Sequence, residues 1–334
     1  MAVAEPLFVG IEIGGTKVQV ACGDGRGRIR RLWRGAVEPR EGAAGVLRQV
    51  AHGVREVVGG RKPLAVGIGF GGPVFWRTGR VCKSHHVEGW DGYPLVAWLR
   101  RQVGAPVFLE NDANVAALGE AVAGAGRRKG PVFYMTVGSG IGGGLVVEGE
   151  IYHGAEPGEM EIGHTRIPVS GRPASRWPIL ETLASGWSVD RRVRAAIRCR
   201  PRSLLARLAT KCGEGGARIL WPAVREGDIE AGRIWEEATD GLALALSHVV
   251  HLAHPEVLVL GGGLSLIGEP LRRAVEVKMG ALVMAAHRGT WCLRLAALGE
   301  RVVPVGALLL AARRLAESPS TLRLRRARRF PRMR

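Results

Sequence analysis

The stretch that decides the fold spans residues 134–164 and reads YMTVGSGIGGGLVVEGEIYHGAEPGEMEIGH. Within it, a turn built mainly of glycine, residues 138–144, separates two apolar, strand-like runs. Because glycine has no Cβ, such a turn can press its backbone N–H groups against a bound anion. Side chains of the kind that hold hydroxyl groups follow at Glu159, Glu161 and His164. A phosphate cradle next to a hydroxyl-binding patch indicates phosphoryl transfer onto a polyol or a sugar.

The composition is typical of a folded enzyme. A chain of 334 residues is long for a single core, so two domains are expected. The five cysteines are scattered and form no CxxC pair, which favours neither a disulfide framework nor a zinc site. The N-terminus lacks the basic region of a signal peptide, and no apolar run approaches the roughly 20 residues that span a bilayer. We therefore expect a cytoplasmic protein without membrane contact.

The formal net charge of +18 comes partly from the tail, residues 318–334, which holds seven arginines and no acid. Arginine-rich segments can bind the phosphates of nucleic acids. Arginine is, however, frequent along the whole chain, so the excess indicates a compositional bias, and nucleic-acid binding is the lesser reading. The tail has few apolar residues to bury and is predicted to be disordered. We expect its removal to leave activity and folding intact.

Hydropathy patterns outline strands and helices in both halves of the chain. A strand at 106–110 runs directly into Asn111-Asp112 and a helix at 113–123. This places an acid at the carboxyl end of a strand, the usual location of a ligand crevice in α/β sheets. Each half opens with a hairpin and a glycine turn, a weak internal repeat that predicts two α/β lobes with a cleft. The other expected elements are helices at 42–58 and 93–103, strand-like runs at 7–21, 64–70, 132–137 and 144–148, and an apolar run at 255–263.

Two glycine motifs resemble better-known nucleotide signatures without matching them. The spacing of Gly138, Gly140 and Gly143 fits the dinucleotide fingerprint, but that fingerprint must open a helix, and here a strand pattern follows. Residues 10–17 nearly match a P-loop, yet threonine and lysine stand in the reverse order and a strand follows again. Both turns are therefore predicted to be hairpin tips that meet phosphates with backbone donors.

Taken in order along the chain, these motifs resemble the ROK family of sugar kinases, within the actin-like and hexokinase-like ATPase superfamily. The resemblance runs from about residue 8 to residue 315 and implies an α/β fold of two actin-like (ribonuclease H-like) lobes with a central cleft. It implies a small lobe at 1–115, joined by a helix at about 304–316, and a large lobe at 116–303. The segments that carry it are EIGGTK (12–17), GFGGPV (69–74), GW (89–90), ENDANVAALGE (110–120), TVGSGIGGG (136–144), GEMEIGH (158–164), LETLASG (180–186), HPEVLVLGGG (254–263) and VGA (305–307).

The resemblance also implies a role for each matching residue, with ATP and Mg²⁺ as cofactors. Asp112 would be the general base that takes the proton of the attacking sugar hydroxyl. Glu12 would hold Mg²⁺ through a water molecule. The sugar would be bound by Gly72, Asn111, Glu161, His164 and Glu181. The phosphates would lie against Gly14, Gly15, Thr16, Lys17, Gly138, Ser139 and Gly140, and the adenine nucleotide against Gly262 and Gly263.

Taken alone, the same residues have plainer interpretations. Asp112 could merely cap the helix that follows it. His164 could be a structural histidine, and Glu181 could be a solvated acid on a helix. At the level of the whole protein, two alternatives to a kinase stay open. One is a sugar-responsive regulator, although such family members carry a helix-turn-helix ahead of the first phosphate motif and this chain begins just before it. The other is a sugar-binding protein without catalysis.

The departures from the family pattern concern metal and specificity. Many members carry a cysteine-rich zinc loop where this chain has residues 165–179, which contain no cysteine, so no zinc site is expected. Glu12 stands where aspartate is common, and its extra methylene could shift the metal ion. Phe75 and His86 also replace residues that are frequent near the sugar loop. The sequence does not name the sugar, and the family resemblance implies a homodimer.

Overall fold

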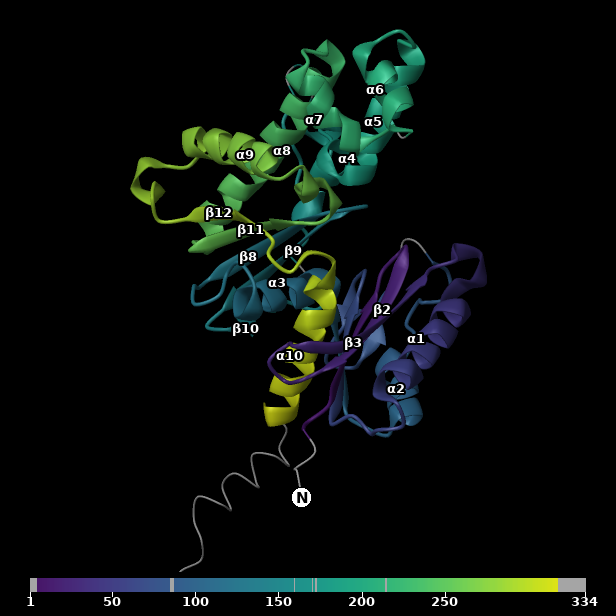
Figure 1. Ribbon diagram of the computed structural model, residues 1–334. Coiled ribbons are helices and arrows are strands. Elements are labelled where there is room, and N and C mark those ends of the chain that lie inside the picture. Colours follow the sequence, from purple (N-terminus) through teal and green to yellow (C-terminus); the bar gives the residue numbers. More distant parts are fainter. Residues whose placement is uncertain are drawn as a thin grey trace, which may run out of the picture. The chain divides into compact units, whose positions relative to one another are not determined.

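Two five-stranded sheets with the same strand order organise the described residues (Figure 1). The first has the order β3-β2-β1-β4-β7 and the second the order β10-β9-β8-β11-β12. In each sheet a central strand has an antiparallel neighbour on one side and a parallel neighbour on the other. The repeated order matches the internal repeat that the two glycine hairpins predict.

The computed structural model describes residues 5–84, 87–158, 160–169, 171, 173–213 and 215–317. Glu159, His86 and the basic tail, about which the sequence raises expectations, lie outside these residues. The chain divides into two units. Unit 1 contains the described parts of Met1–Ala123, Glu150–Glu159 and Glu300–Arg334, and unit 2 contains those of Gly124–Gly149 and Met160–Gly299.

Apart from the edge strand β3, the strands of the unit 1 sheet are buried on both faces. Its strands are β1 (Phe8–Ile13), β2 (Lys17–Gly23), β3 (Ile29–Ala36), β4 (Ala65–Phe70) and β7 (Val107–Asn111). On β1, Val9, Ile11 and Ile13 join the core under the first helices, whereas Gly10 faces the last helix of the chain. Because successive strand residues point to opposite faces, Glu12 lies on the same face as Gly10. Unit 1 also contains the short strands β5 (Val74–Phe75), β6 (Arg80–Val81) and β10 (Glu150–Ile151).

Four helices cover this sheet. The helices α1 (Gly42–Val58) and α2 (Leu95–Val103) pack on one face, and α3 (Asp112–Ala123) and α10 (Val302–Glu317) on the other (Figure 1). The backbones of α3 and α10 touch, since a Cβ on Gly306 would lie 1.9 Å from the carbonyl oxygen of Val115. This contact explains why all of α3 belongs to unit 1, where the sequence places the end of the first lobe at residue 115. Residues 150–158 join unit 1 as well, which no local pattern signals.

Unit 2 carries four strands of the second sheet and a larger set of helices. Its strands are β8 (Val132–Val137), β9 (Ile141–Val147), β11 (Val257–Gly261) and β12 (Cys292–Leu295). Helix α8 packs against α4, α5, α7 and α9, and its apolar residues form one core with the strands. The helices are α4 (Leu180–Ala184), α5 (Gly186–Cys199), α6 (Leu204–Cys212), α7 (Ala217–Arg225), α8 (Ile229–Ala253) and α9 (Glu269–Leu282).

Most expected elements are present within two residues of their predicted bounds, and the helix at 42–58 has the predicted bounds. One expectation is wrong. The predicted glycine turn at 138–144 ends at Gly140, because Gly142, Gly143 and Gly144 pair with β8 as part of β9. Glycine is rare in strands, so composition alone suggested a longer turn. In the described part of the chain, no helix is long and apolar enough to cross a membrane.

Candidate active site

The parallel strands of unit 1 end side by side, which gathers the predicted residues of this unit at one edge of the sheet. Ile13 of β1 pairs with Phe70 of β4, and Phe70 pairs with Asn111 of β7. Loops follow β1 and β4 from Gly14 and Gly71, and helix α3 follows β7 directly from Asp112. These segments are in contact. The backbone N–H of Gly71 donates to the carbonyl of Ile13 over 2.8 Å. A Cβ on Gly71 would lie 3.3 Å from Asp112 Oδ2. This is the edge where α/β sheets bind ligands.

Asn111, and not Asp112, caps helix α3. Asn111 Oδ1 accepts hydrogen bonds from the backbone N–H groups of Ala113 (2.8 Å) and Asn114 (3.3 Å). Its Nδ2 donates to the carbonyl of Gly72 over 3.2 Å, so the same side chain fixes the loop after β4. The capping role that could have explained Asp112 therefore falls to its neighbour. Asp112 is half-buried and stands in the first turn of the helix, where the helix dipole favours a negative charge.

A buried carboxylate, Glu110, forms hydrogen bonds with the first residues of this segment, Asn111 and Asn114. Glu110 Oε1 accepts from the backbone N–H of Asn111 (3.0 Å) and from Asn114 Nδ2 (3.1 Å). Its other oxygen, Oε2, shares a 2.5 Å hydrogen bond with His153 Nε2. Glu110 is 2% exposed, so these bonds replace the solvation it has lost. The ring of Trp76 stacks on His153 with 4.3 Å between centroids, which fixes the imidazole.

We expect His153→Phe to destabilise the protein by about 1–3 kcal/mol, because it leaves Glu110 Oε2 buried without its partner. Chemical denaturation followed by fluorescence measures the change. His52→Phe is a matched control, since His52 is exposed and meets Trp33 edge-on, a contact that phenylalanine can keep. The double variant His153→Phe/Glu110→Leu should regain part of the loss, because it removes both members of the pair. A His153→Phe protein as stable as the parent would contradict this account of Glu110.

Glu12 is another buried carboxylate of unit 1, at 7% exposed. Gln19 Nε2 donates to Glu12 Oε2 over 2.5 Å, and Lys17 Nζ lies 3.5 Å from Oε1. Gln19 is oriented in turn by Arg34, whose Nε donates to its Oε1 over 2.8 Å, and by the carbonyl of Glu300. Burial raises the pKa of the Glu12 carboxyl above its ordinary value, although Lys17 and Gln19 oppose the change.

The two glycine turns are hairpin tips, as predicted. In unit 1 the tip joins β1 and β2, and the N–H of Gly14 closes it by donating to the carbonyl of Lys17 over 3.0 Å. Gly15 and Thr16 stand between them. In unit 2 the tip joins β8 and β9, and the N–H of Gly138 donates to the carbonyl of Gly140 over 2.9 Å. Ser139 is the exposed residue of this tip.

In unit 2 the carboxyl ends of β8 and β11 also lie side by side, since Gly261 pairs with Thr136. The turn at Gly138 and the glycines at Gly262 and Gly263 are therefore neighbours. Glycine is required at 262, because its φ is +83° and a Cβ would lie 2.6 Å from backbone atoms of Val137. The predicted phosphate and nucleotide residues of this unit thus meet at one edge of its sheet.

Glu181 contacts this turn directly. Its Oε2 accepts a hydrogen bond from the backbone N–H of Ile141 over 2.8 Å. Glu161 precedes the 3-10 helix η2 (Ile162–His164), His164 is its last residue, and both are exposed. The N–H of Leu180 donates to the carbonyl of Thr165 over 2.8 Å, which joins η2 to the helix that carries Glu181. The three predicted hydroxyl-binding residues of unit 2 therefore stand on adjoining elements.

The sequence reasoning missed Glu110, Gln19 and His153. The sequence does mark Gln19, because it is the one polar residue in the apolar run VQVAC. In the structure its side chain is fully buried. Glu110 and His153 are 43 residues apart and carry no local pattern. As for metals, the described residues contain no cluster of three or more histidine, cysteine, aspartate or glutamate side chains placed to hold an ion. The expectation that the protein binds no zinc stays a prediction for metal analysis.

The family model, the related sequences and the solved structures that resemble this chain all point to the same family. The ROK family matches residues 8–314. A glucokinase of Thermotoga maritima is 32% identical over 85% of this chain and 90% of its own length, and a glucokinase of Halalkalibacterium halodurans is 30% identical over 90% and 93%. The crystal structure of a ROK family glucokinase from Streptomyces griseus, in complex with glucose and AMPPNP, superposes with a TM-score of 0.78 at 28% identity. It covers 92% of this chain and 99% of that one, and the expected α/β fold of actin-like lobes is confirmed.

Proposed function

The chain belongs to the ROK family, and from that premise we propose that it transfers the γ-phosphoryl group of ATP to a hydroxyl group of a hexose. One observation carries the proposal for the chemistry. A carboxylate, Asp112, stands at the carboxyl end of β7 beside two glycine loops, those that begin at Gly14 and Gly71. Relatives that are glucokinases make glucose the first sugar to test.

Asp112 accepts the proton of the attacking hydroxyl. The hydroxyl oxygen forms a bond to the γ-phosphorus of ATP, the bond from that phosphorus to the β,γ-bridging oxygen breaks, and ADP leaves. A carboxylate suits this role because phosphoryl transfer depends mainly on positioning and on stabilising charge, so a weak base is sufficient. Asn111 and the Glu110 network hold the start of α3 and so fix the direction of the Asp112 side chain.

Backbone donors of the two hairpin tips bind the phosphates. Gly15 and Thr16 belong to unit 1, and Ser139 and Gly140 to unit 2. Lys17 follows the first tip and adds a positive charge, while Gly262 and Gly263 lie against the adenine nucleotide. Such tips suit phosphates because several N–H groups converge where no side chain intervenes.

The residues also fit a bound Mg²⁺. This ion keeps several waters and is commonly held by one or two carboxylates together with substrate phosphates, so a full protein cage is not needed. Glu12 is the buried carboxylate at the phosphate tip of unit 1 and would hold the ion through water. When bound, Mg²⁺ neutralises charge on the phosphates. The lysine and glutamine beside Glu12 restrict its rotamer and so fix where its oxygens lie.

The sugar is held by polar groups that form hydrogen bonds with its hydroxyl groups. In unit 1 these groups belong to Asn111 and the Gly72 loop. In unit 2 they belong to Glu161, His164 and Glu181. Glu181 gives one oxygen to the backbone N–H of Ile141, and a carboxylate has further lone pairs that can accept from a hydroxyl.

A coupled ADP-release screen with Mg·ATP tests the proposal, run over glucose, mannose, fructose, allose and N-acetylated hexosamines. We expect turnover with at least one hexose and saturation by both substrates. ADP release that does not depend on any sugar would contradict a sugar kinase. We also propose that the protein is a cytoplasmic homodimer, and light scattering of the purified chain gives its mass in solution.

A further inference from the structure

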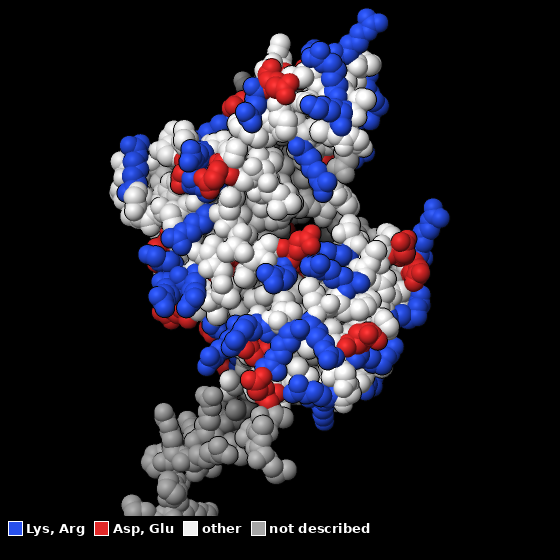
Figure 2. Space-filling view, viewed as in Figure 1, with Lys and Arg blue, Asp and Glu red and all other residues white. Residues whose placement is uncertain are grey.

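Helix α5 presents a row of exposed side chains that the kinase chemistry above does not use. Its members follow one another at spacings of four, three and four residues, which places them on one face of the helix. All of them are exposed, and together with Asp190 they line a depression of about 290 Å³. We call this row the arginine track, and it consists of Trp187, Arg191, Arg194 and Arg198. Figure 2 shows blue side chains projecting from the helical end of unit 2, at the top of the view.

The charge of the track is not compensated by neighbouring acids. Elsewhere on the helices of unit 2, Arg192, Arg233 and Arg272 each form ion pairs with glutamates. Among the residues that the structure describes, no carboxylate lies within ion-pair distance of the three arginines of the track. The acid in the depression, Asp190, is engaged elsewhere, since its Oδ1 accepts from the backbone N–H of Ala217. The track therefore offers its positive charge to a partner.

The track is narrow and linear. With a rise of about 1.5 Å per residue, it is about 16 Å long from Trp187 to Arg198. With about 100° of rotation per residue, its four side chains occupy a sector of about 60° around the helix axis. The opposite side of α5 carries Val189 and Val193, which are buried in the core of unit 2. A stripe of this shape fits one extended polyanion, whereas a flat anionic membrane would also meet the residues on either side of the row.

The aromatic end of the track distinguishes one class of polyanion from the others. Trp187 is 52% exposed, although tryptophan is on average a highly buried residue. Proteins that bind single-stranded nucleic acid combine a positive groove, which follows the phosphates, with aromatic side chains on which bases stack. An acidic peptide offers the arginines a similar charge but brings no bases to stack on an indole. The combination of Trp187 with the arginine row therefore favours a nucleic acid strand.

The structure changes the weight of the basic composition at this helix. Residues 186–225 contain nine arginines and one lysine against two acids, and a count of this kind alone is explained by the compositional bias of the chain. A count does not show that three of these arginines stand in line, that they lack acidic partners among the described residues, and that an exposed tryptophan ends their row. These three features are properties of the folded helix.

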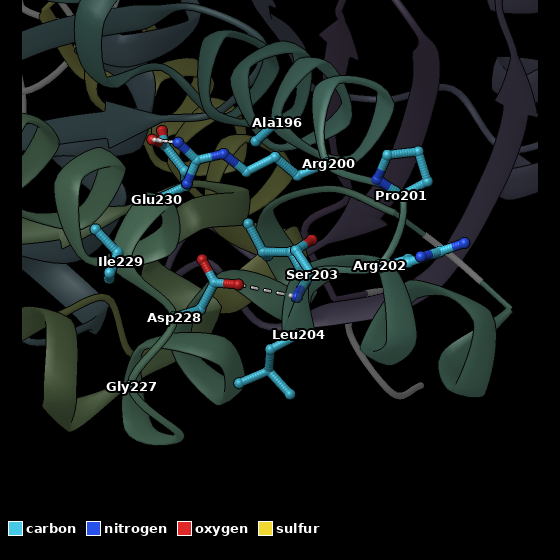
Figure 3. Close-up of a pocket in the computed structure, with 11 residues that line it drawn as sticks. Ala196, Arg200, Pro201, Arg202, Ser203, Leu204, Gly227, Asp228, Ile229 and Glu230 are labelled. Atoms are coloured by element: carbon cyan, nitrogen blue, oxygen red, sulfur yellow. Dashed lines mark hydrogen bonds and ion pairs between the residues drawn. The ribbon is translucent and has the colours of Figure 1, made fainter.

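A second cavity in the same helical region provides a contrast (Figure 3). It measures about 550 Å³, and polar groups in its lining bond to one another or to the adjoining backbone. Asp228 accepts from the backbone N–H groups of Leu205 (3.1 Å) and Ala231 (2.9 Å), and Arg200 pairs with Glu230 at 3.6 Å. The two carboxylates there would repel a polyanion, so the track is the better surface for one.

We propose that the arginine track binds single-stranded nucleic acid, with a base stacked on Trp187 and the phosphates that follow it bound by Arg191, Arg194 and Arg198. At about 3.4 Å per nucleotide of a stacked strand, the track has the length of about five nucleotides. Guanidinium groups suit this task, because they bind phosphate oxygens in pairs. Phosphate contacts and stacking carry little sequence information, so the binding tolerates many sequences. This activity is separate from the proposed phosphoryl transfer and uses none of its residues.

The test measures the affinity of the full chain for a short fluorescein-labelled oligonucleotide of mixed sequence by fluorescence anisotropy, at several salt concentrations. The oligonucleotide is used as single-stranded RNA and as single-stranded DNA. The track variant Arg191→Gln/Arg194→Gln/Arg198→Gln is compared with a control variant, Arg55→Gln/Arg100→Gln/Arg101→Gln, which removes three exposed arginines from helices of unit 1. Both variants have the same net charge and keep the basic tail, so neither property can produce a difference between them.

We expect the track variant to bind at least about ten-fold more weakly than the control variant at low salt. Each phosphate contact of a single strand contributes about 0.7 to the slope of log K against log salt concentration. The slope of the track variant should therefore be smaller by about 2. Trp187→Leu should weaken binding about five-fold to a hundred-fold, the usual cost of losing one stacked base, and leave the salt slope unchanged. Trp187→Phe should keep most of the affinity. The tighter of the RNA and DNA strands identifies the nucleic acid that the track prefers.

Equal affinities and slopes of the track and control variants would overturn the inference, because binding would then belong to the tail or to the overall charge. Parental affinity of Trp187→Leu would overturn it as well, since a partner that needs only charge does not stack. If the track variant lost binding to phosphatidylserine vesicles but kept binding to both oligonucleotides, the track would be a membrane surface and the inference would be wrong. Thermal melts verify that every variant is folded.

Discussion

Replacing Asp112 with asparagine is expected to lower kcat about 10²–10⁴-fold, the usual cost of losing a general base. Asparagine has nearly the same shape, so it can keep the packing at the start of α3. It cannot take a proton from the sugar hydroxyl at neutral pH. Because Asn111 and not Asp112 caps α3, the helix keeps its cap in the variant. The affinity for the sugar should therefore stay within a few-fold of the parent.

Steady-state kinetics with the best sugar gives kcat, and equilibrium titration with the sugar gives Kd. Asp91→Asn is the matched control, since Asp91 is an exposed aspartate of the same unit. The control should change neither quantity. A variant at position 112 with near parental kcat would show that another group takes the proton. A loss confined to sugar affinity would instead assign Asp112 to binding.

The sequence predicted best what local patterns encode. The hairpin tip at Gly138 followed from a strand, a cluster of glycines and a second strand, and the helix at 42–58 followed from apolar residues at helical spacing. The placement of Asp112 followed from a strand that runs straight into an acid. In each case the residues that specify the element are neighbours along the chain.

What the sequence could not predict depends on contacts between distant residues. Glu110 reads as the last polar residue of a strand, and nothing near it shows that His153 covers it. The turn after Gly140 was predicted too long, because the pairing of Gly142 to Gly144 depends on a partner strand and not on their own β propensity. Similarly, the alternation on β1 tells that Glu12 shares a face with Gly10 but not that Gln19 reaches it.

The second large effect is expected at Glu12. Glu12→Gln should lower kcat/KM for Mg·ATP about 10–100-fold, the usual cost of losing a partner in the outer shell of a metal ion. Glutamine keeps the shape and can still accept a hydrogen bond from Gln19, but it carries no charge for Mg²⁺ or for Lys17. Glu38→Gln, an exposed glutamate of the same unit, is the control and should leave the kinetics unchanged.

The same variant should be more stable than the parent at neutral pH. Burial raises the pKa of Glu12 in the folded state, so the folded protein holds this proton more tightly than the unfolded chain does. The stabilisation that comes from binding this proton is fully present below the pKa that Glu12 has in the unfolded chain. It is lost as the pH rises through the pKa that Glu12 has in the folded protein. Glutamine has no such dependence. The Tm of the variant should therefore approach the parental value below about pH 4 and exceed it increasingly toward pH 7–8.

Thermal melts of both proteins without metal or nucleotide, across this pH range, measure the difference, and each kcal/mol corresponds to about 2–4 °C in a unit of this size. A variant that melts lower than the parent at pH 7 would mean that Lys17 and Gln19 outweigh the cost of burial, and the raised pKa would be wrong. If the variant melts higher yet loses activity, the carboxylate at position 12 is retained for phosphoryl transfer at the expense of stability. That pair of results would separate a functional Glu12 from a structural one, since a purely structural carboxylate would not lower activity in a more stable protein.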